Sequence, residues 1–207
     1  MNYFYVRLSL AWLMCAGVGC TSAPVRYYTL APTPDKTFQG LQSGFVIDVR
    51  VVHTPPQLTH SELMLRTGPT EVALLENERW VSPLKDEVKE ALRLALQRSF
   101  SRMSASRAAF NKLTLDIEMQ RLEAEVGRYA LLEASWSATL SATGQSSNEA
   151  RVAACAFQAD EEIHGGYAGI VEGYQREIAA LAEAIARALT SPADGTDPSC
   201  HYSPTRG

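Results

Sequence analysis

The sequence predicts an α+β fold in which an antiparallel sheet carries two amphipathic helices on one face. Apolar and polar residues alternate over residues 113–120 and 130–141, which is the period of strands with one dry face and one wet face. Apolar residues recur at intervals of three and four over residues 84–96 and 170–189, which predicts the helices. The expected sheet is therefore a meander of three strands joined by N-terminal strands.

Short strands are expected before the first helix. They are indicated by aromatic and β-branched residues and by alternation of apolar with charged side chains. Pro55 and Pro56 make the link between them rigid and extended, and Gly68-Pro69 indicates the turn of a hairpin. The expected elements are strands over residues 25–30 and 45–51, an extended link over 54–58, and a hairpin of 62–66 with 71–75.

Each helix has its own start signal. Ser82 is expected to cap the first helix with its hydroxyl, and Pro83 occupies the first helical position, after which the helix runs to about Arg102. Gly165-Gly166 opens the second helix, which ends near Thr190. Between the helices we expect a loop up to Ala109, strands over 113–120, 130–141 and 149–159, turns at 126–128 and 144–148, and a solvated acidic turn at 160–162.

The first twenty residues have the composition of an export signal. A single Arg7 precedes an apolar run from Leu8 to Val18, which is too short to span a bilayer and has the length of a signal-peptide core. Small residues stand directly before Cys20, an arrangement that resembles the lipobox at which bacterial lipoproteins are acylated and cleaved. Cys20 would then be the first residue of the mature chain. An ordinary secretory peptide and an uncleaved amphipathic N-terminus are the alternatives.

Composition restricts the classes of partner. The 207 residues are 46% hydrophobic and 20% charged with a net charge of −4, as in an average globular protein. The sequence carries no basic cluster that would attract nucleic acid or anionic headgroups. The expected organisation is a signal peptide over 1–19, a lipidated tether over 20–26, one α+β domain over 27–190 and a disordered tail over 191–207.

The cysteines divide into two pairs. Cys15 lies in the signal and Cys20 is assigned to the lipid, which leaves Cys155 and Cys200 in an oxidising compartment. Two outcomes stay open for this second pair. Either a disulfide ties the tail to a strand, or Cys155 is a small packing residue and Cys200 is loose in the tail, because the sequence does not show whether the two approach each other.

The sequence contains no convincing catalytic or metal-binding constellation. Ser82 and Lys85 match the S-x-x-K of penicillin-binding proteins, but the partner motifs S-D-N and K-T-G do not occur in the sequence. A periplasmic serine hydrolase is therefore only a minor alternative, and we expect neither an enzyme nor a cofactor. No metal site is expected either, because the histidines are scattered at positions 53, 60, 164 and 201.

Several segments stand in a specific order along the chain. They are Tyr27-Tyr28-Thr29-Leu30, Val51-Val52-His53-Thr54-Pro55-Pro56-Gln57-Leu58, Leu63-Met64-Leu65-Arg66, Arg79-Trp80-Val81-Ser82-Pro83-Leu84, Leu132-Glu133-Ala134-Ser135-Trp136, Tyr167-Ala168-Gly169-Ile170-Val171 and Ala182-Glu183-Ala184-Ile185-Ala186. Their order and spacing, behind the lipobox, resemble the ABC-type transport auxiliary lipoprotein family. The resemblance covers the chain from Tyr27 to about Leu189.

This resemblance implies a lipoprotein of the outer membrane that faces the periplasm and is held by acyl groups, such as palmitate, on Cys20. It further implies a homo-oligomeric ring that docks an MCE-domain protein of an ABC-type intermembrane lipid transporter and catalyses nothing. Thr21, in place of aspartate, agrees with sorting to the outer membrane. The residues selected for the ring or partner interface are Tyr27, Tyr28, Pro55, Pro56 and Trp80. The alternative is a periplasmic lipid-binding shuttle or chaperone that carries an acyl chain in its own cavity.

Overall fold

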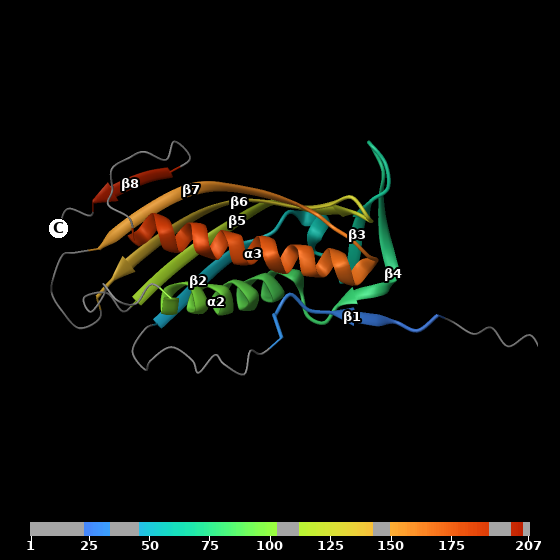
Figure 1. Cartoon of the computed structure of the whole chain (residues 1–207), viewed down its shortest axis with the longest axis horizontal. Helices are drawn as coiled ribbons and strands as arrows, with labels where there is room; N and C mark the ends of the chain where they lie inside the picture. The colour runs from blue at the N-terminus through green and yellow to red at the C-terminus, as the bar shows by residue number, and fades with distance from the viewer. Residues whose placement is uncertain (1–22, 34–45, 103–111, 143–149, 191–199, 205–207) are drawn as a thin grey trace, which may run out of the picture.

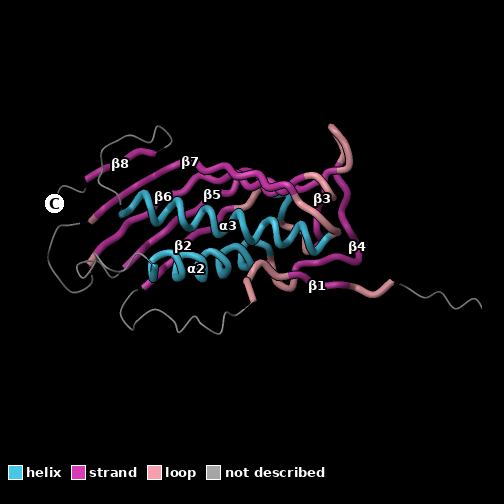
Figure 2. Tube along the Cα trace, in the orientation of Figure 1, coloured by secondary structure: helices cyan, strands magenta, loops and turns pink. Residues whose placement is uncertain are grey.

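Two β-sheets and two long helices make up the described part of the chain. The computed structural model describes residues 23–33, 46–102, 112–142, 150–190 and 200–204. The elements are β1 (Arg26–Tyr28), β2 (Val46–His53), η1 (Pro56–Leu58), β3 (Glu62–Arg66), β4 (Val72–Trp80), α2 (Leu84–Arg102), β5 (Lys112–Glu125), β6 (Tyr129–Ser141), β7 (Arg151–Glu162), α3 (Tyr167–Thr190) and β8 (Cys200–Pro204). Figures 1 and 2 show both helices on one side of the larger sheet, which confirms the predicted α+β class.

The larger sheet contains the predicted meander. Its strand order is β2-β5-β6-β7-β8, and β5, β6 and β7 pair antiparallel in sequence order. Gly127 makes the turn between β5 and β6 at a φ of 70°, a conformation that glycine adopts without steric cost.

The N-terminal strands depart from the predicted single antiparallel sheet. β2 pairs parallel with β5, and β1 pairs parallel with β4 in a separate three-stranded sheet of order β1-β4-β3. Parallel strands need a long crossover connection, which the hairpin and α2 supply between β2 and β5. The alternation of side chains reports burial on one face and does not report the direction of the neighbouring strand.

The helices bury the predicted apolar stripes against the sheet and each other. All of the residues predicted for these stripes are at most 8% exposed: Leu84, Val88, Leu92, Ala95 and Leu96 on α2, and Ile170, Tyr174, Ile178, Leu181, Ile185 and Leu189 on α3. Gly173 allows α3 to approach β6 closely, because a Cβ there would lie 3.1 Å from the Cβ of Ala130. None of the helices in the described ranges is long and apolar enough to cross a bilayer.

The start of α2 differs from the predicted cap. The Pro83 carbonyl accepts hydrogen bonds from the amides of Asp86 and Glu87, at 2.8 and 3.1 Å, and the helix begins at Leu84. The Ser82 hydroxyl does not act as the expected acceptor for a backbone amide but donates to the carboxylate of Glu87 at 2.5 Å.

Two segments that were predicted to be irregular have regular structure. The predicted extended link contains η1, in which the Leu58 amide donates to the Pro55 carbonyl at 2.9 Å. The predicted acidic turn at 160–162 is the end of β7, where these residues pair with the start of β6. The predicted loop up to Ala109 and the turn at 144–148 lie outside the described residues.

Residues 200–204 correct the prediction of a disordered tail over that part of 191–207, and the rest of this segment lies outside the described residues. Residues 200–204 form β8, which pairs antiparallel with β7 and extends the larger sheet. Cys155 and Cys200 lie opposite each other in this register and are joined by a disulfide with an S–S distance of 2.06 Å. The structure therefore takes the first of the two outcomes that the sequence left open for this pair.

Replacing Cys155 and Cys200 together by serine should lower the free energy of unfolding by about 2–4 kcal/mol, since the crosslink closes a long loop in the unfolded chain. Denaturant titration with and without reductant measures this loss. Reductant should destabilise the natural protein to the same extent and leave the double variant unchanged. Reactive thiols at both positions in the native, unreduced protein would contradict the crosslink.

Candidate functional site

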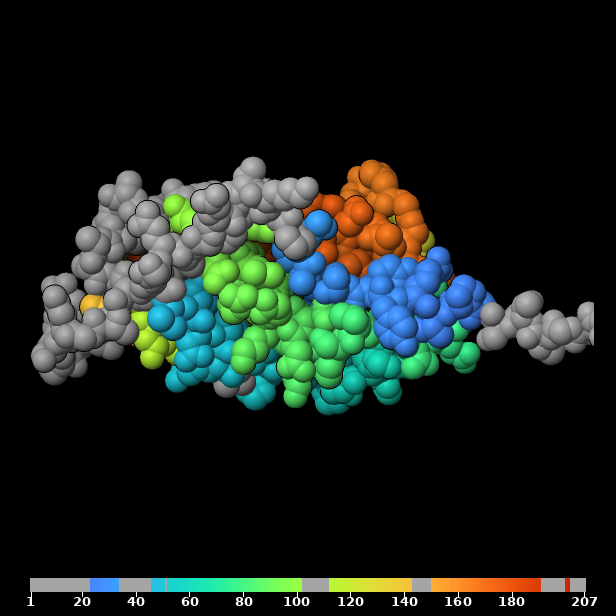
Figure 3. All heavy atoms as spheres, turned by 90° about the horizontal axis from the view of Figure 1, so that it is seen from below, coloured from blue at the N-terminus to red at the C-terminus, as the bar shows by residue number. Residues whose placement is uncertain are grey.

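The strand β1 is fastened to the domain by two buried carboxylates, Glu78 on β4 and Glu87 on α2, each 5% exposed. Figure 3 shows the N-terminal segment in blue on the surface, between the green segment that opens α2 and the orange start of α3. We call the two carboxylates, together with residues 26–30 that they bind, the β1 latch. It joins the segment that follows Cys20 to both helices and to the smaller sheet.

Glu78 holds the first half of the latch. The Arg26 Nε–H reaches both carboxylate oxygens, at 2.9 Å each, and the Tyr28 hydroxyl donates to Oε2 at 2.7 Å. The Arg26 guanidinium also lies 5.8 Å from the centre of the Tyr167 ring on α3. Because Arg26 and Tyr28 donate to the ionised form, the pKa of Glu78 is lowered despite its burial. The carboxylate is therefore charged at neutral pH.

Glu87 holds the second half of the latch. One carboxylate oxygen accepts hydrogen bonds from the Leu30 amide at 2.9 Å and from the Thr29 hydroxyl at 2.7 Å. The other accepts from the Ser82 hydroxyl at 2.5 Å. Gln175 on α3 donates to the Thr29 carbonyl at 3.1 Å. With its amide held in this way, Leu30 is completely buried.

These contacts give Ser82 a structural role. Its hydroxyl is engaged with Glu87, and Lys85 is exposed on the surface of α2, so the serine-hydrolase alternative gains no support from the geometry. In the part of the chain that the structure describes, no three His, Cys, Asp or Glu side chains gather to hold a metal ion. The scattered histidines include His53 at the end of β2 and His201 on β8.

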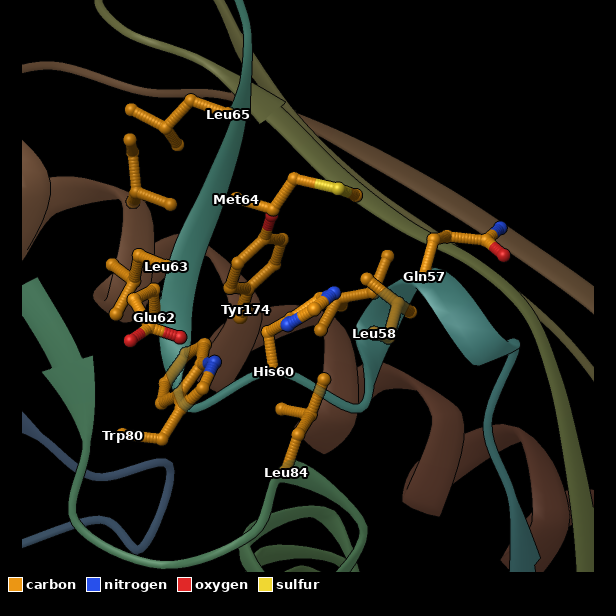
Figure 4. A pocket seen from close by; sticks show the side chains of 12 residues that line it. Gln57, Leu58, His60, Glu62, Leu63, Met64, Leu65, Trp80, Leu84 and Tyr174 are labelled. Atoms are coloured by element: carbon orange, nitrogen blue, oxygen red, sulfur yellow. The ribbon is translucent and has the colours of Figure 1, made fainter. Parts of the chain in front are cut away.

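A small hollow adjoins the latch, beneath η1 and the β3–β4 hairpin (Figure 4). Leu58, Leu63 and Trp80 are buried around it, and His60 is exposed at its rim. The rings of Trp80 and Tyr174 meet at its base with their centres 6.5 Å apart. Its volume of about 10 Å³ has room for about one water molecule.

The structure brings the segments of all five predicted interface residues to one end of the domain. Tyr28 and Trp80 are paired across β1 and β4, and η1, which follows Pro55, lines the same hollow as Trp80. Tyr27 is 64% exposed and Pro56 is exposed, whereas Tyr28 and Pro55 are half-buried. Trp80 is only 6% exposed, so it is a core residue in this structure. The exposed part of the predicted surface is therefore Tyr27 with Pro56.

Cys20 lies outside the described residues, six positions before β1 begins. A chain of six residues spans at most about 20 Å when fully extended. Any membrane anchor on Cys20 would therefore keep the β1 latch within that distance of the membrane surface.

A third buried carboxylate lies between α3 and the larger sheet. Glu177 is completely buried, and neither of its carboxylate oxygens has a hydrogen-bond partner in the described structure. Burial, reinforced by the negative charges of Glu161 and Asp160, raises the pKa of Glu177 to about 8. Arg176 opposes this shift only partly, and its guanidinium donates to Glu161 at 2.7 Å. Glu177 is therefore mainly protonated at neutral pH.

The sequence predictions included none of these three carboxylates. Glu177 lies three residues after Tyr174, and Glu87 lies three residues after Leu84, so both are in phase with a buried stripe. An acidic residue at such a position is the signal that identifies a buried carboxylate on a helix. Glu78 has no comparable signal, because it lies among charged residues on β4.

The fold and the latch define a class of protein: an α+β domain whose N-terminal strand is locked in place directly after a candidate lipidation site. Residues 28–186 match the family described as the ABC-type transport auxiliary lipoprotein component, and the chain belongs to this family. The match confirms the resemblance that was found in the sequence.

Solved structures share the fold at low sequence identity. A crystal structure of an uncharacterized protein superposes with a TM-score of 0.56 at 18% identity, covering 80% of this chain and 98% of that chain. Protein XCC0632 from Xanthomonas campestris matches with a TM-score of 0.44 at 15% identity, covering 79% and 93%. Among curated proteins, no sequence matches this chain. The similarity to the uncharacterized protein supports the fold and carries no information on function.

Glu78→Gln should loosen β1, because the substitution removes the charge from a buried acceptor of two side-chain donors. Amide hydrogen exchange in residues 27–30 should become at least about tenfold faster. Glu76→Gln, at an exposed position of the same strand, is the matched control and should leave exchange unchanged. Equal exchange in both variants would show that Glu78 does not hold the strand.

Stability should fall as pH rises from about 4.5 to about 8, because the unfolded Glu177 carboxyl releases its proton near 4.5 and the folded one near 8. Over this window the folded state binds more protons than the unfolded state. Glu177→Gln should remove this slope and gain roughly 1–3 kcal/mol at pH 8 relative to the natural protein.

Urea titrations across this pH range measure the effect. Glu172→Gln, which changes an exposed carboxyl on the same helix, should keep the slope of the natural protein. If the Glu177→Gln and Glu172→Gln proteins show the same pH dependence, Glu177 does not titrate as its burial requires.

Proposed function

We propose that this protein is held at the outer membrane by acyl groups on Cys20 and docks an MCE-domain partner of an ABC-type lipid transporter. The observation that supports the proposal is the family match over residues 28–186, nearly the whole folded domain. The family description includes both a lipid anchor and a transporter. The outer membrane, the MCE-domain partner and the absence of catalysis are the parts that we add from the sequence resemblance.

The β1 latch supports an anchoring role on physical grounds. A lipid anchor restrains only the residue that carries it, so a docking protein needs a firm connection from that residue to the folded domain. Here the short segment after Cys20 leads into residues 26–30, of which Glu78 binds β1 and Glu87 binds the two residues that follow it. A pull on the N-terminus would load charge-assisted hydrogen bonds to two buried carboxylates, which are stronger than hydrogen bonds between neutral groups.

Neither hollow in the described structure is suited to an acyl chain, which favours docking of a protein partner over the lipid-shuttle alternative. The hollow beneath the hairpin, at about 10 Å³, cannot hold an acyl chain. A second depression of about 370 Å³ lies on the face of the larger sheet, and its rim includes Asp116, Glu118, Ser135 and Ser137. The lining also includes Ile117, Trp136 and Ala154, but the depression is open to solvent, whereas a site for an acyl chain is enclosed.

The sheet edges support the proposed ring. β1 and β3 are the edges of the smaller sheet, and β2 and β8 are the edges of the larger one. Edge strands carry backbone groups that can pair with a neighbouring copy, and head-to-tail pairing that closes produces a ring. We therefore propose that the protein acts as a homo-oligomer.

Cys20→Ser should remove the protein from the outer-membrane fraction, because it removes the thiol that is acylated. Membrane fractionation followed by mass spectrometry of the N-terminal peptide measures both location and acylation. The Cys155→Ser/Cys200→Ser double variant is the matched control, since it loses the other cysteine pair and should remain in the membrane. A Cys20→Ser protein that still fractionates with the outer membrane would contradict the anchor.

Docking is tested separately by affinity capture of the acylated protein from envelope extracts that contain the transporter. Recovery of an MCE-domain protein is the expected result. Capture of an acylated, oligomeric protein without any MCE-domain component would retain the anchor and overturn the partner.

A further inference from the structure

Exposed large apolar residues gather at the end of the domain that carries the β1 latch. In the described ranges these residues are Val25, Tyr27, Val46, Val72, Leu74, Val81 and Val126, each at least 44% exposed. Six of the seven lie on or next to β1 and β4 or in the turn between β5 and β6. Figure 1 shows these segments at one end of the molecule, and it shows the start of β2, where Val46 lies, at the other end.

The β3–β4 hairpin presents part of this apolar surface away from the core. Leu63 and Leu65 point into the core and are 2% and 4% exposed. Since side chains alternate along a strand, Leu74, which is paired with Met64, lies on the opposite face. Val72 follows on the same face, opposite Arg66. Met64 itself is half-buried and packs against the core. We call Val72 and Leu74, which are 51% and 45% exposed, the outer strip of the hairpin.

The arginines around the outer strip are paired with carboxylates. The distances are 2.8 Å from Arg66 to Glu123, 3.2 Å from Arg79 to Glu62, and 2.5 Å from Arg128 to Glu125. Arg26 is likewise paired with Glu78. This end of the domain therefore offers apolar contact without an excess of positive charge for anionic headgroups.

We propose that the outer strip and Tyr27 rest in the headgroup–acyl boundary of the membrane that anchors the chain. This inference rests on the proposed acylation of Cys20. The six chain steps from Cys20 to Arg26 reach at most about 20 Å, so the elements adjoining β1 are the ones brought to the lipid surface. Tyrosine suits that boundary, because its ring is apolar and its hydroxyl is polar.

Covalent anchoring explains how a strip this small can serve as a membrane contact. A few exposed side chains bind a bilayer too weakly to hold a protein that diffuses freely. A short tether makes the contact intramolecular and raises the effective lipid concentration at the strip. The anchor supplies the affinity, and the strip fixes which end of the domain faces the lipid.

An environment-sensitive fluorophore placed on the acylated protein tests this contact. Leu74→Cys carries the probe on the outer strip, and Val46→Cys is the matched control at the other end, where the side chain is 51% exposed. Both proteins are reconstituted into phosphatidylcholine vesicles that contain lipid with a quencher near the headgroup. Quenching should be at least about threefold stronger at position 74, and it should not change with added phosphatidylglycerol or salt, because the contact is apolar.

Equal quenching at the two positions would overturn the inference, as would a probe at position 74 that is shielded only when a protein partner is added. Val72→Cys should repeat the result of Leu74→Cys, and thermal melts monitored by circular dichroism should show that each labelled protein is folded. Mass spectrometry of the protein from the same vesicles distinguishes a failure of the proposed acylation from a failure of the proposed membrane contact. Loss of the acyl groups on Cys20 would refute the proposed function, whereas an acylated protein with an unquenched strip would refute the membrane contact alone.

Discussion

The pairing of β1 with two buried carboxylates is the interaction on which the N-terminal end of this domain depends. β1 has only three residues in regular pairing, and an edge strand this short gains little from backbone hydrogen bonds alone. Glu78 and Glu87 add charge-assisted bonds to a side chain, two hydroxyls and a backbone amide of the same segment. Because each carboxylate is buried, losing its donors would leave an uncompensated charge, and this penalty keeps the strand in place.

Glu78 and Glu177 are both buried, but they are buried in different protonation states. Glu78 stays ionised because Arg26 and Tyr28 donate to it, which lowers its pKa. Glu177 has no such donors and lies near the negative charges of Glu161 and Asp160, so its pKa rises to about 8 and it is buried as a neutral acid. At neutral pH, which lies between the lowered pKa of Glu78 and the raised pKa of Glu177, the first group is ionised and the second is mainly protonated. The two groups therefore make stability depend on pH in opposite directions: Glu78 loses its contribution as pH falls, and Glu177 as pH rises.

The parts of the fold that could be predicted are those in which one face of an element is buried. The helical stripes through Leu92 and Ile178 and the alternation around Leu115 report that asymmetry directly. The direction of β2 and the pairing of β8 depend on a distant partner, so local periodicity does not contain them. The candidate site was predictable only in outline: the five selected residues lie on segments that meet at one end. Of the carboxylates that join these segments, Glu87 has a signal in its phase with the buried stripe of α2, whereas Glu78 has none.

Because the domain is longer than the reach of the N-terminal segment, it matters which end of the domain faces the membrane. α3 has 24 residues and is about 36 Å long, which exceeds the reach of about 20 Å between Cys20 and β1. Tyr167, at the start of α3, lies against Arg26 of the latch, so the end of α3 and the disulfide-linked β8 lie far from the latch. A domain that rests on its latch end would therefore raise its opposite end beyond the reach of the tether. A flexible attachment of β1 would lose this geometry, because the anchor would then fix the position of the chain without fixing the direction of the domain.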